Sequence, residues 1–122
     1  MGLDMFAYVT AEKLASAVDF PEPENYEELH YWRKHPNLHG WMEALYVKKG
    51  GRDRPFNMSP LMLDSADLDR LEAAIKRKKL PDTIGFFFGN SDGSETGDDL
   101  SFIAKARQAI ALGNVVFYLA WW

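Results

Sequence analysis

The chain has 122 residues, no cysteine, and 18 acidic residues against 14 basic ones, which gives a formal net charge of −4. This length is typical of one domain, so we expect residues 1–122 to form a single domain. The lack of cysteine excludes disulfides, cysteine-based zinc sites and a cysteine nucleophile. The acidic balance argues against a protein that holds nucleic acid by bulk positive charge.

The first residues lack the basic and long apolar stretches of a signal peptide, and no apolar run approaches the ~20 residues of a membrane span. A chain without cysteine also fits a reducing compartment. We therefore expect a cytoplasmic protein that has no membrane partner.

The first part of the chain is expected to contain a strand followed by helical segments. Apolar residues dominate 3–10 and predict a strand, whereas 11–18 are compatible with a short helix before a proline-containing loop. Asn25 and Glu28 have the spacing of a capping box, which predicts a helix over residues 25–35.

Pro36 should end that helix and begin a second one, which is expected to run to about Lys48. The apolar face of this second helix has the i, i+3, i+4, i+7 spacing of a helix that packs on a core. The residues on it are Leu38, Trp41, Met42 and Leu45.

In the second half, residues 56–63, 83–88 and 115–122 read as strands, and 66–79 and 96–112 read as helices. The predicted fold is α+β: a two-layer sandwich with an approximately four-stranded mixed sheet and three to four helices packed on it. A parallel pair of strands is expected wherever one helix separates them.

The most unusual local segment spans residues 31–41. A break at Pro36 would gather several polar side chains, and such a cluster can bind a phosphate, a carboxylate or a base. Trp32 lies either in the core or beside the cluster as a stacking surface. The alternative is a surface helix whose polar groups satisfy a helix junction. The side chains of the predicted cluster are Arg33, His35, Asn37 and His39.

Asp4 is a further candidate because it is an acid within an apolar strand. Alternation places it on one face with Phe6 and Tyr8, where it would pair with Arg33 or with a histidine at the sheet edge. The alternative is an exposed charge on an edge strand, which limits aggregation.

No metal, cofactor or catalytic residue is assigned from the sequence. His35 and His39 have the i, i+4 spacing of helical zinc pairs, but Pro36 disturbs that register. Oxygen donors alternate along the loop 89–99, yet the glycine and glutamate of a calcium-binding EF-hand are missing. Gly-x-Ser-x-Gly and phosphate-binding glycine motifs are absent, so the sequence favours a binding protein over an enzyme.

Several distinctive segments are spread over almost the whole chain. They are Met1-Gly2-Leu3-Asp4-Met5-Phe6, Tyr31-Trp32-Arg33-Lys34-His35, Leu38-His39-Gly40-Trp41, Phe56-Asn57, Phe86-Phe87-Phe88-Gly89 and Trp121-Trp122. Together they resemble a family of small uncharacterised proteins of bacteriophages and prophages. The resemblance implies an accessory role in the host cytoplasm, directed at a host or phage component, and it assigns no catalytic residue. Some members carry a phosphoglycerate kinase label, for which this chain is far too short.

Three functions are compatible with these features. The first is stoichiometric binding to a host or phage macromolecule, most readily a protein, with inhibition of a defence system as one form. The second is a small enzyme or sensor for nucleotides or phosphate esters, with Arg33, His35, His39 and Asp4 as its working residues. The third is a single-stranded nucleic-acid binder that stacks bases on Trp32 and Trp41.

Overall fold

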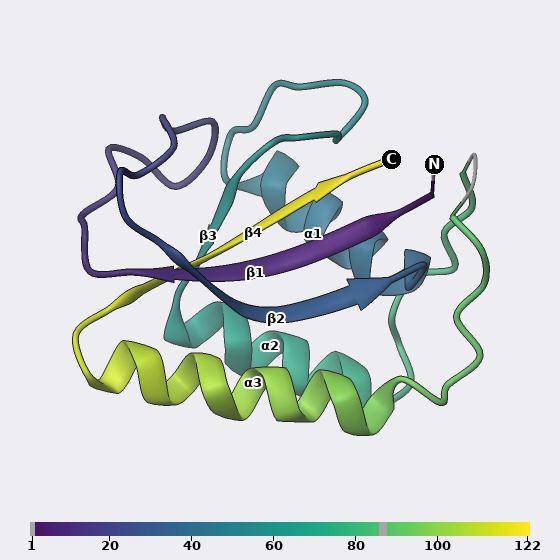
Figure 1. Ribbon diagram of the computed structural model, residues 1–122. Coiled ribbons are helices and arrows are strands. Elements are labelled where there is room, and N and C mark those ends of the chain that lie inside the picture. Colours follow the sequence, from purple (N-terminus) through teal and green to yellow (C-terminus); the bar gives the residue numbers. More distant parts are fainter. Residues whose placement is uncertain (1, 86–87) are drawn as a thin grey trace.

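A computed structural model describes residues 2–85 and 88–122, and it contains a four-stranded sheet with helices packed on one face (Figure 1). The strands lie in the order β2-β1-β4-β3, and all of their pairings are antiparallel. Their bounds are β1 (Asp4–Thr10), β2 (Glu27–Arg33), β3 (Leu61–Leu63) and β4 (Val115–Trp121). The helices are α1 (Pro36–Lys48), α2 (Ser65–Lys76) and α3 (Thr96–Ala111).

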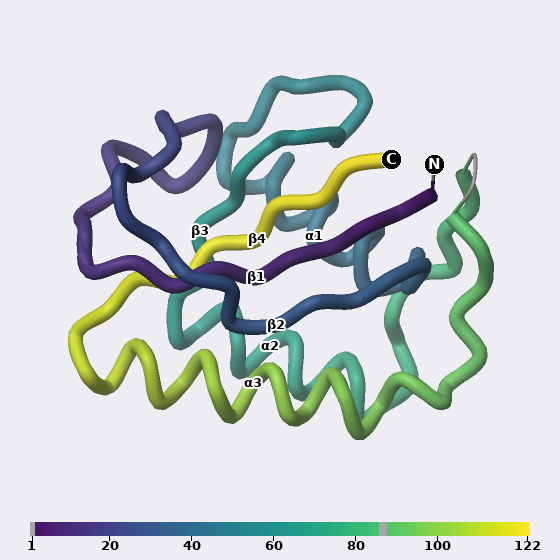
Figure 2. Tube along the Cα trace, in the orientation of Figure 1, coloured from purple at the N-terminus to yellow at the C-terminus, as the bar shows by residue number. Residues whose placement is uncertain are grey.

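The α+β sandwich is therefore confirmed, but its described strand pairs are all antiparallel and the expected parallel pair does not occur among them. The reason lies in the connection between β3 and β4, which contains two helices in place of one. Helix α2 leads away from β3 and α3 returns beside it, as the trace in Figure 2 shows. The chain thus re-enters the sheet in the opposite direction.

The helix predicted over residues 25–35 is wrong, because most of this segment is strand β2. The spacing of Asn25 and Glu28 is a purely local signal, whereas β2 pairs along its length with β1. Pairing with β1 buries His30 and Trp32 on one side of the sheet, and this burial outweighs the local helix-start signal. Lys34 then turns the chain into α1 with a positive φ of 55°.

Other differences are confined to loops and strand ends. Residues 11–18 form no helix, and the strand predicted over 56–63 is reduced to β3. Of the strand predicted over 83–88, residues 83–85 and Phe88 lie outside any strand, and residues 86–87 fall outside the described part of the chain. Helices α1, α2 and α3 agree with the prediction to within a few residues.

The core lies between the three helices and one face of the sheet. Alternate residues of the strands point into it, including Trp32 of β2, Met5 of β1 and Tyr118 of β4. Leu38 and Met42 of α1 are fully buried there, as the helical spacing predicted. None of the helices in the described part of the chain combines the length and apolar character needed to cross a bilayer.

The packing of α1 gives a direct test of this fold. A Cβ atom added to Gly40 would lie 1.9 Å from the Thr83 Oγ1 atom. We expect Gly40→Ala to lower the free energy of unfolding by about 1–3 kcal/mol through overpacking, although alanine is the better helix former.

Thr83→Ala should restore most of this loss of stability when it is combined with Gly40→Ala in a double variant. Gly97→Ala, which meets open space in α3, is the matched control for urea denaturation. An unchanged stability for Gly40→Ala would contradict the contact between α1 and Thr83.

Candidate functional site

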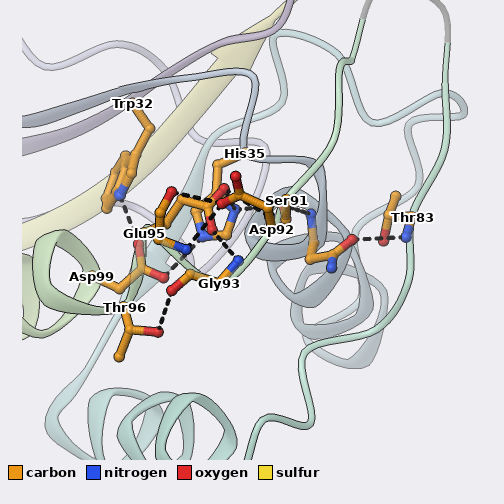
Figure 3. Close-up of polar contacts among 11 residues, drawn as sticks. Trp32, His35, Thr83, Ser91, Asp92, Gly93, Glu95, Thr96 and Asp99 are labelled. Atoms are coloured by element: carbon orange, nitrogen blue, oxygen red, sulfur yellow. Dashed lines mark hydrogen bonds and ion pairs between the residues drawn. The ribbon is translucent and has the colours of Figure 1, made fainter.

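A buried histidine joins three separate segments at one end of the sheet (Figure 3). His35 lies between β2 and α1 and is 3% exposed. Its Nε2 atom is 2.8 Å from Oδ2 of Asp99, in the first turn of α3, and its Nδ1 atom is 2.7 Å from Oγ of Ser91. Asp99 is 2% exposed, so this pair is held away from solvent.

The contacts of Asp99 determine which nitrogen of His35 carries the proton. A carboxylate can only accept hydrogen bonds. Oδ1 of Asp99 accepts the indole N–H of Trp32 at 3.0 Å, and Oδ2 faces Nε2 of His35. In neutral His35 the Nε2 atom therefore carries the hydrogen, and Nδ1 accepts the hydroxyl hydrogen of Ser91.

The start of α1 explains why Ser91 lies here. Pro36 occupies the first turn, and α1 has no side-chain cap of its own. Ser91 supplies the missing cap from a distant loop, because its Oγ atom accepts the Asn37 backbone N–H at 3.1 Å. The Asn37 side chain in turn accepts the Thr83 backbone N–H at 3.0 Å (Figure 3). The segment between α2 and α3 is thus tied to the beginning of α1.

These residues form one wall of a pocket of about 430 Å³. Three further carboxylates line the pocket, those of Asp82, Asp92 and Glu95. The lining also includes one lysine, Lys78. Hydrogen bonds from the Ser94 hydroxyl and backbone hold the pKa of Asp92 below its usual range. The surplus of carboxylates makes the pocket suited to positively charged groups and unsuited to phosphate.

Asp4 and Arg33 lie away from this pocket, on the face of the sheet opposite the helices. Arg33 Nη1 is 2.9 Å from Asp4 Oδ1, and the Tyr31 hydroxyl donates to the same oxygen at 2.6 Å. Asp4 thus has the Arg33 partner that its place in an apolar strand predicted. Its side chain is 23% exposed and that of Arg33 is 47% exposed.

Aromatic side chains cover the same face, which we call the open face because none of the three described helices packs on it (Figure 1). The Phe6 ring stacks on Trp121 at 4.7 Å and on Tyr8 at 5.6 Å between centroids, and it contacts Tyr31 at 4.9 Å. Tyr31 is 42% exposed. The strand register places the residues on this side of the sheet in three rows: Arg33, Asp4, Trp121; Tyr31, Phe6, Leu119; and Glu28, Tyr8, Phe117, Met62. Phe117 in the third row is buried, because Phe20 packs edge-on against it.

His39 belongs to neither surface. It is 2% exposed within the core, and its Nδ1 atom is 2.7 Å from the Tyr118 hydroxyl. The Phe56 ring stacks on it at 5.0 Å. Burial lowers the pKa of His39 to about 4, against a smaller opposing effect of the Phe56 backbone.

The predicted site residues are therefore divided among three places. His35 and Asn37 line the pocket, whereas Trp32 is buried in the core as a donor to Asp99 and is unavailable for stacking. Asp4 and Arg33 lie on the open face and His39 in the core. Sequence reasoning missed Ser91 and Asp99, because their positions in a loop and a helix start carry no signal of a histidine partner.

Among residues 2–85 and 88–122, no group of three or more histidine, aspartate or glutamate side chains is placed to hold a metal ion. In comparisons with known proteins, no family model, no curated protein and no solved structure matches this chain.

Proposed function

We propose that this protein acts by stoichiometric binding to a partner protein, and that the open face is the binding surface. The observation that supports this is the strip of stacked aromatic rings on a sheet face that no helix covers. Tyrosine, tryptophan and arginine dominate the binding energy of protein interfaces. Tyr31 is exposed and Phe6, Tyr8 and Trp121 are partly exposed, and apolar surface of this kind is typical of interaction sites.

On the resemblance to phage proteins, we propose that the protein acts in the cytoplasm of a bacterial host, with a host or phage protein as its partner. A defence system of the host is one class of target for such an accessory protein. Tyr31 and Trp121 of the open face are the side chains we expect to contribute most to binding.

Charge supports a protein partner over nucleic acid. Glu28 and Asp4 stand in the rows of the open face, and Arg33 is paired with Asp4. The carboxylates of Glu28 and Asp4 would repel the phosphates of a nucleic acid, even though the aromatic rings offer stacking surfaces. A partner with basic side chains among its apolar contacts fits this face best.

The phosphate-ester alternative receives no support from the arrangement of its residues. Arg33 is on the open face and His39 is in the core, so these two do not converge with His35. The pocket beside His35 has more carboxylates than cations.

Affinity capture from a bacterial lysate tests the proposal. Wild type should retain a specific protein in a one-to-one complex that survives nuclease treatment, and Tyr31→Ser should lose about tenfold or more in affinity. Val47→Ser is the matched control, because Val47 is 45% exposed on α1. Equal capture by both variants, or capture that nuclease abolishes, would contradict binding of a protein at the open face.

A further inference from the structure

We propose that Ser91, His35 and Asp99 form a nucleophilic site that hydrolyses esters bearing a positively charged group. This inference goes beyond partner binding and does not depend on the open face. It rests on the unbroken chain of contacts from Ser91 Oγ to His35 Nδ1 at 2.7 Å and from His35 Nε2 to Asp99 Oδ2 at 2.8 Å.

Each member of the chain has the contact that its role requires. A nucleophilic hydroxyl needs a base within hydrogen-bond reach, and the base needs a third group that orients it. Asp99 holds the hydrogen of Nε2, so Nδ1 is left to take the proton of Ser91. In the usual serine-protease arrangement the acid faces Nδ1 and the serine faces Nε2, whereas here the acid faces Nε2 and Ser91 faces Nδ1. The roles are the same, because they require only that the acid and the hydroxyl face opposite ring nitrogens.

The orientation of Asp99 is itself fixed. Its second oxygen accepts the buried indole N–H of Trp32 at 3.0 Å. Trp32 packs edge-on against Phe102 of α3 with centroids 4.9 Å apart. Asp99 is thus held from two sides, which gives the site the preorganisation that catalysis requires.

The surroundings of Ser91 also offer access for a substrate and hydrogen-bond donors that can stabilise negative charge during the reaction. Ser91 is half-buried and lines the pocket of about 430 Å³. The Asn37 backbone N–H donates to Ser91 Oγ at 3.1 Å, so it would stabilise the negative charge that this oxygen develops as its proton leaves. Because Thr83 occupies the Asn37 side-chain oxygen, the Asn37 amide NH2 group remains as a second donor on the pocket wall.

The reaction needs no cofactor or oxidant. Ser91 Oγ bonds to the acyl carbon while its proton passes to His35 Nδ1, and Asp99 stabilises the imidazolium. The ester C–O bond then breaks, and the alcohol leaves with the proton from Nδ1. Water attacks the acyl-Ser91 ester in the same way, its proton passing through Nδ1 to Ser91 Oγ, and the acid is released.

The pocket charges indicate the substrate class. Asp82, Asp92 and Glu95 line the cavity, and Glu95 Oε2 is 4.0 Å from His35 Nδ1. These carboxylates would stabilise the imidazolium and attract a positively charged group, but they would repel an anionic substrate. An ester that carries an ammonium group is therefore preferred over its neutral counterpart.

Two thioesters of nearly equal shape test the charge preference: acetylthiocholine and its neutral carbon analogue, 3,3-dimethylbutyl thioacetate. The released thiol can be measured with a thiol reagent without background, because the chain has no cysteine. We expect kcat/KM for acetylthiocholine to exceed that of the neutral analogue by about fivefold or more. Equal or reversed values would overturn the assigned substrate class.

Variants test the nucleophile. Ser91→Ala should lower kcat/KM by at least about 100-fold, while Ser101→Ala, at an exposed position of α3 outside the pocket lining, should leave it unchanged. A fluorophosphonate probe should label wild type at Ser91, as mapped by peptide mass spectrometry, and this readout does not depend on the stability of a variant. No label at Ser91, or full hydrolysis by Ser91→Ala, would overturn the proposal.

Asp99→Asn tests the positioning role separately from folding. The asparagine NH2 group would donate to Nε2 and force the hydrogen onto Nδ1, which then cannot accept the proton of Ser91. We expect kcat to fall by at least about 100-fold with KM little changed, and circular dichroism to show the folded spectrum. An unchanged kcat in folded Asp99→Asn would show that the contacts are structural and overturn the proposal.

Discussion

Replacing Asp67 with alanine is expected to lower the free energy of unfolding by about 3–5 kcal/mol, because it removes one partner of a buried ion pair. Asp67 is fully buried in the first turn of α2. Its carboxylate contacts the ammonium group of Lys49 and the guanidinium of Arg70, and it accepts the Asp64 backbone N–H at 2.9 Å. Lys49 also donates to the Met62 carbonyl at 2.6 Å, so the cluster joins α1, α2 and β3.

The same group predicts a loss of stability in acid. Burial alone would raise the pKa of Asp67, but hydrogen bonds from Lys49 and from the Asp64 backbone outweigh it and hold the pKa below the ordinary 3.8. A carboxyl with a lowered pKa in the folded state stabilises the fold above its ordinary value and loses that contribution as pH falls through the lowered value. Asp67→Ala should lack this part of the acid dependence.

Urea denaturation of both proteins at neutral and acidic pH measures the two effects. Asp69→Ala is the control on the same helix, because Asp69 is 71% exposed in its ion pair with Arg107. We expect this control to change stability by less than about 1 kcal/mol. Equal losses in the two variants would contradict the arrangement around Asp67.

The second large effect is a pH dependence at His39. Burial lowers its pKa from 6.5 to about 4, so the unfolded chain takes up a proton over a range in which the folded chain does not. Falling pH therefore favours unfolding between these two values, and the full loss is about 3 kcal/mol. This window lies above the one assigned to Asp67, so the two contributions are separable.

His39→Asn removes the titrating ring and keeps a side-chain group that can pair with the Tyr118 hydroxyl. We expect this variant to be less stable at neutral pH, because asparagine is smaller and leaves part of the aromatic cavity unfilled. Its free energy of unfolding should nevertheless change much less than that of wild type between pH values of about 7 and 4. Parallel pH profiles from urea denaturation would contradict the burial of neutral His39.

The helices and the two central strands, β1 and β4, follow from local sequence patterns, whereas β2 does not. Leu38, Met42 and Leu45 repeat at the period of a helix and are buried in α1 as expected. In β2, Trp32 points inward and Tyr31 outward, but the capping-box spacing of Asn25 and Glu28 overlaps the start of this strand and predicts a helix. Only pairing with β1, distant in sequence, determines that this segment is a strand.

The candidate site was likewise predictable only in part. The turn at Pro36 indicated that His35 and Asn37 would be presented together, but not their partners. Ser91 and Asp99 are 56 and 64 positions from His35, and their residue types are common at loops and helix starts. A local sequence pattern does not indicate contacts between residues that lie so far apart in the chain.

Strand β2 accounts for the division of the predicted residues between two surfaces. Successive side chains of a strand point to opposite faces, so Tyr31 and Arg33 reach the open face while Trp32 reaches Asp99 in the interior. Variants of Tyr31 should therefore affect partner binding and not hydrolysis, and variants of Ser91 should affect hydrolysis and not partner binding.

Photo-cross-linking from the open face tests the proposed function most directly. A benzophenone side chain placed at Tyr31 should form a covalent product with one specific protein in a bacterial lysate, in a one-to-one ratio by mass. The same group at Val47, which is similarly exposed on α1, should form no such product. Equal products from the two positions, or none from position 31, would contradict binding of a partner protein at the open face.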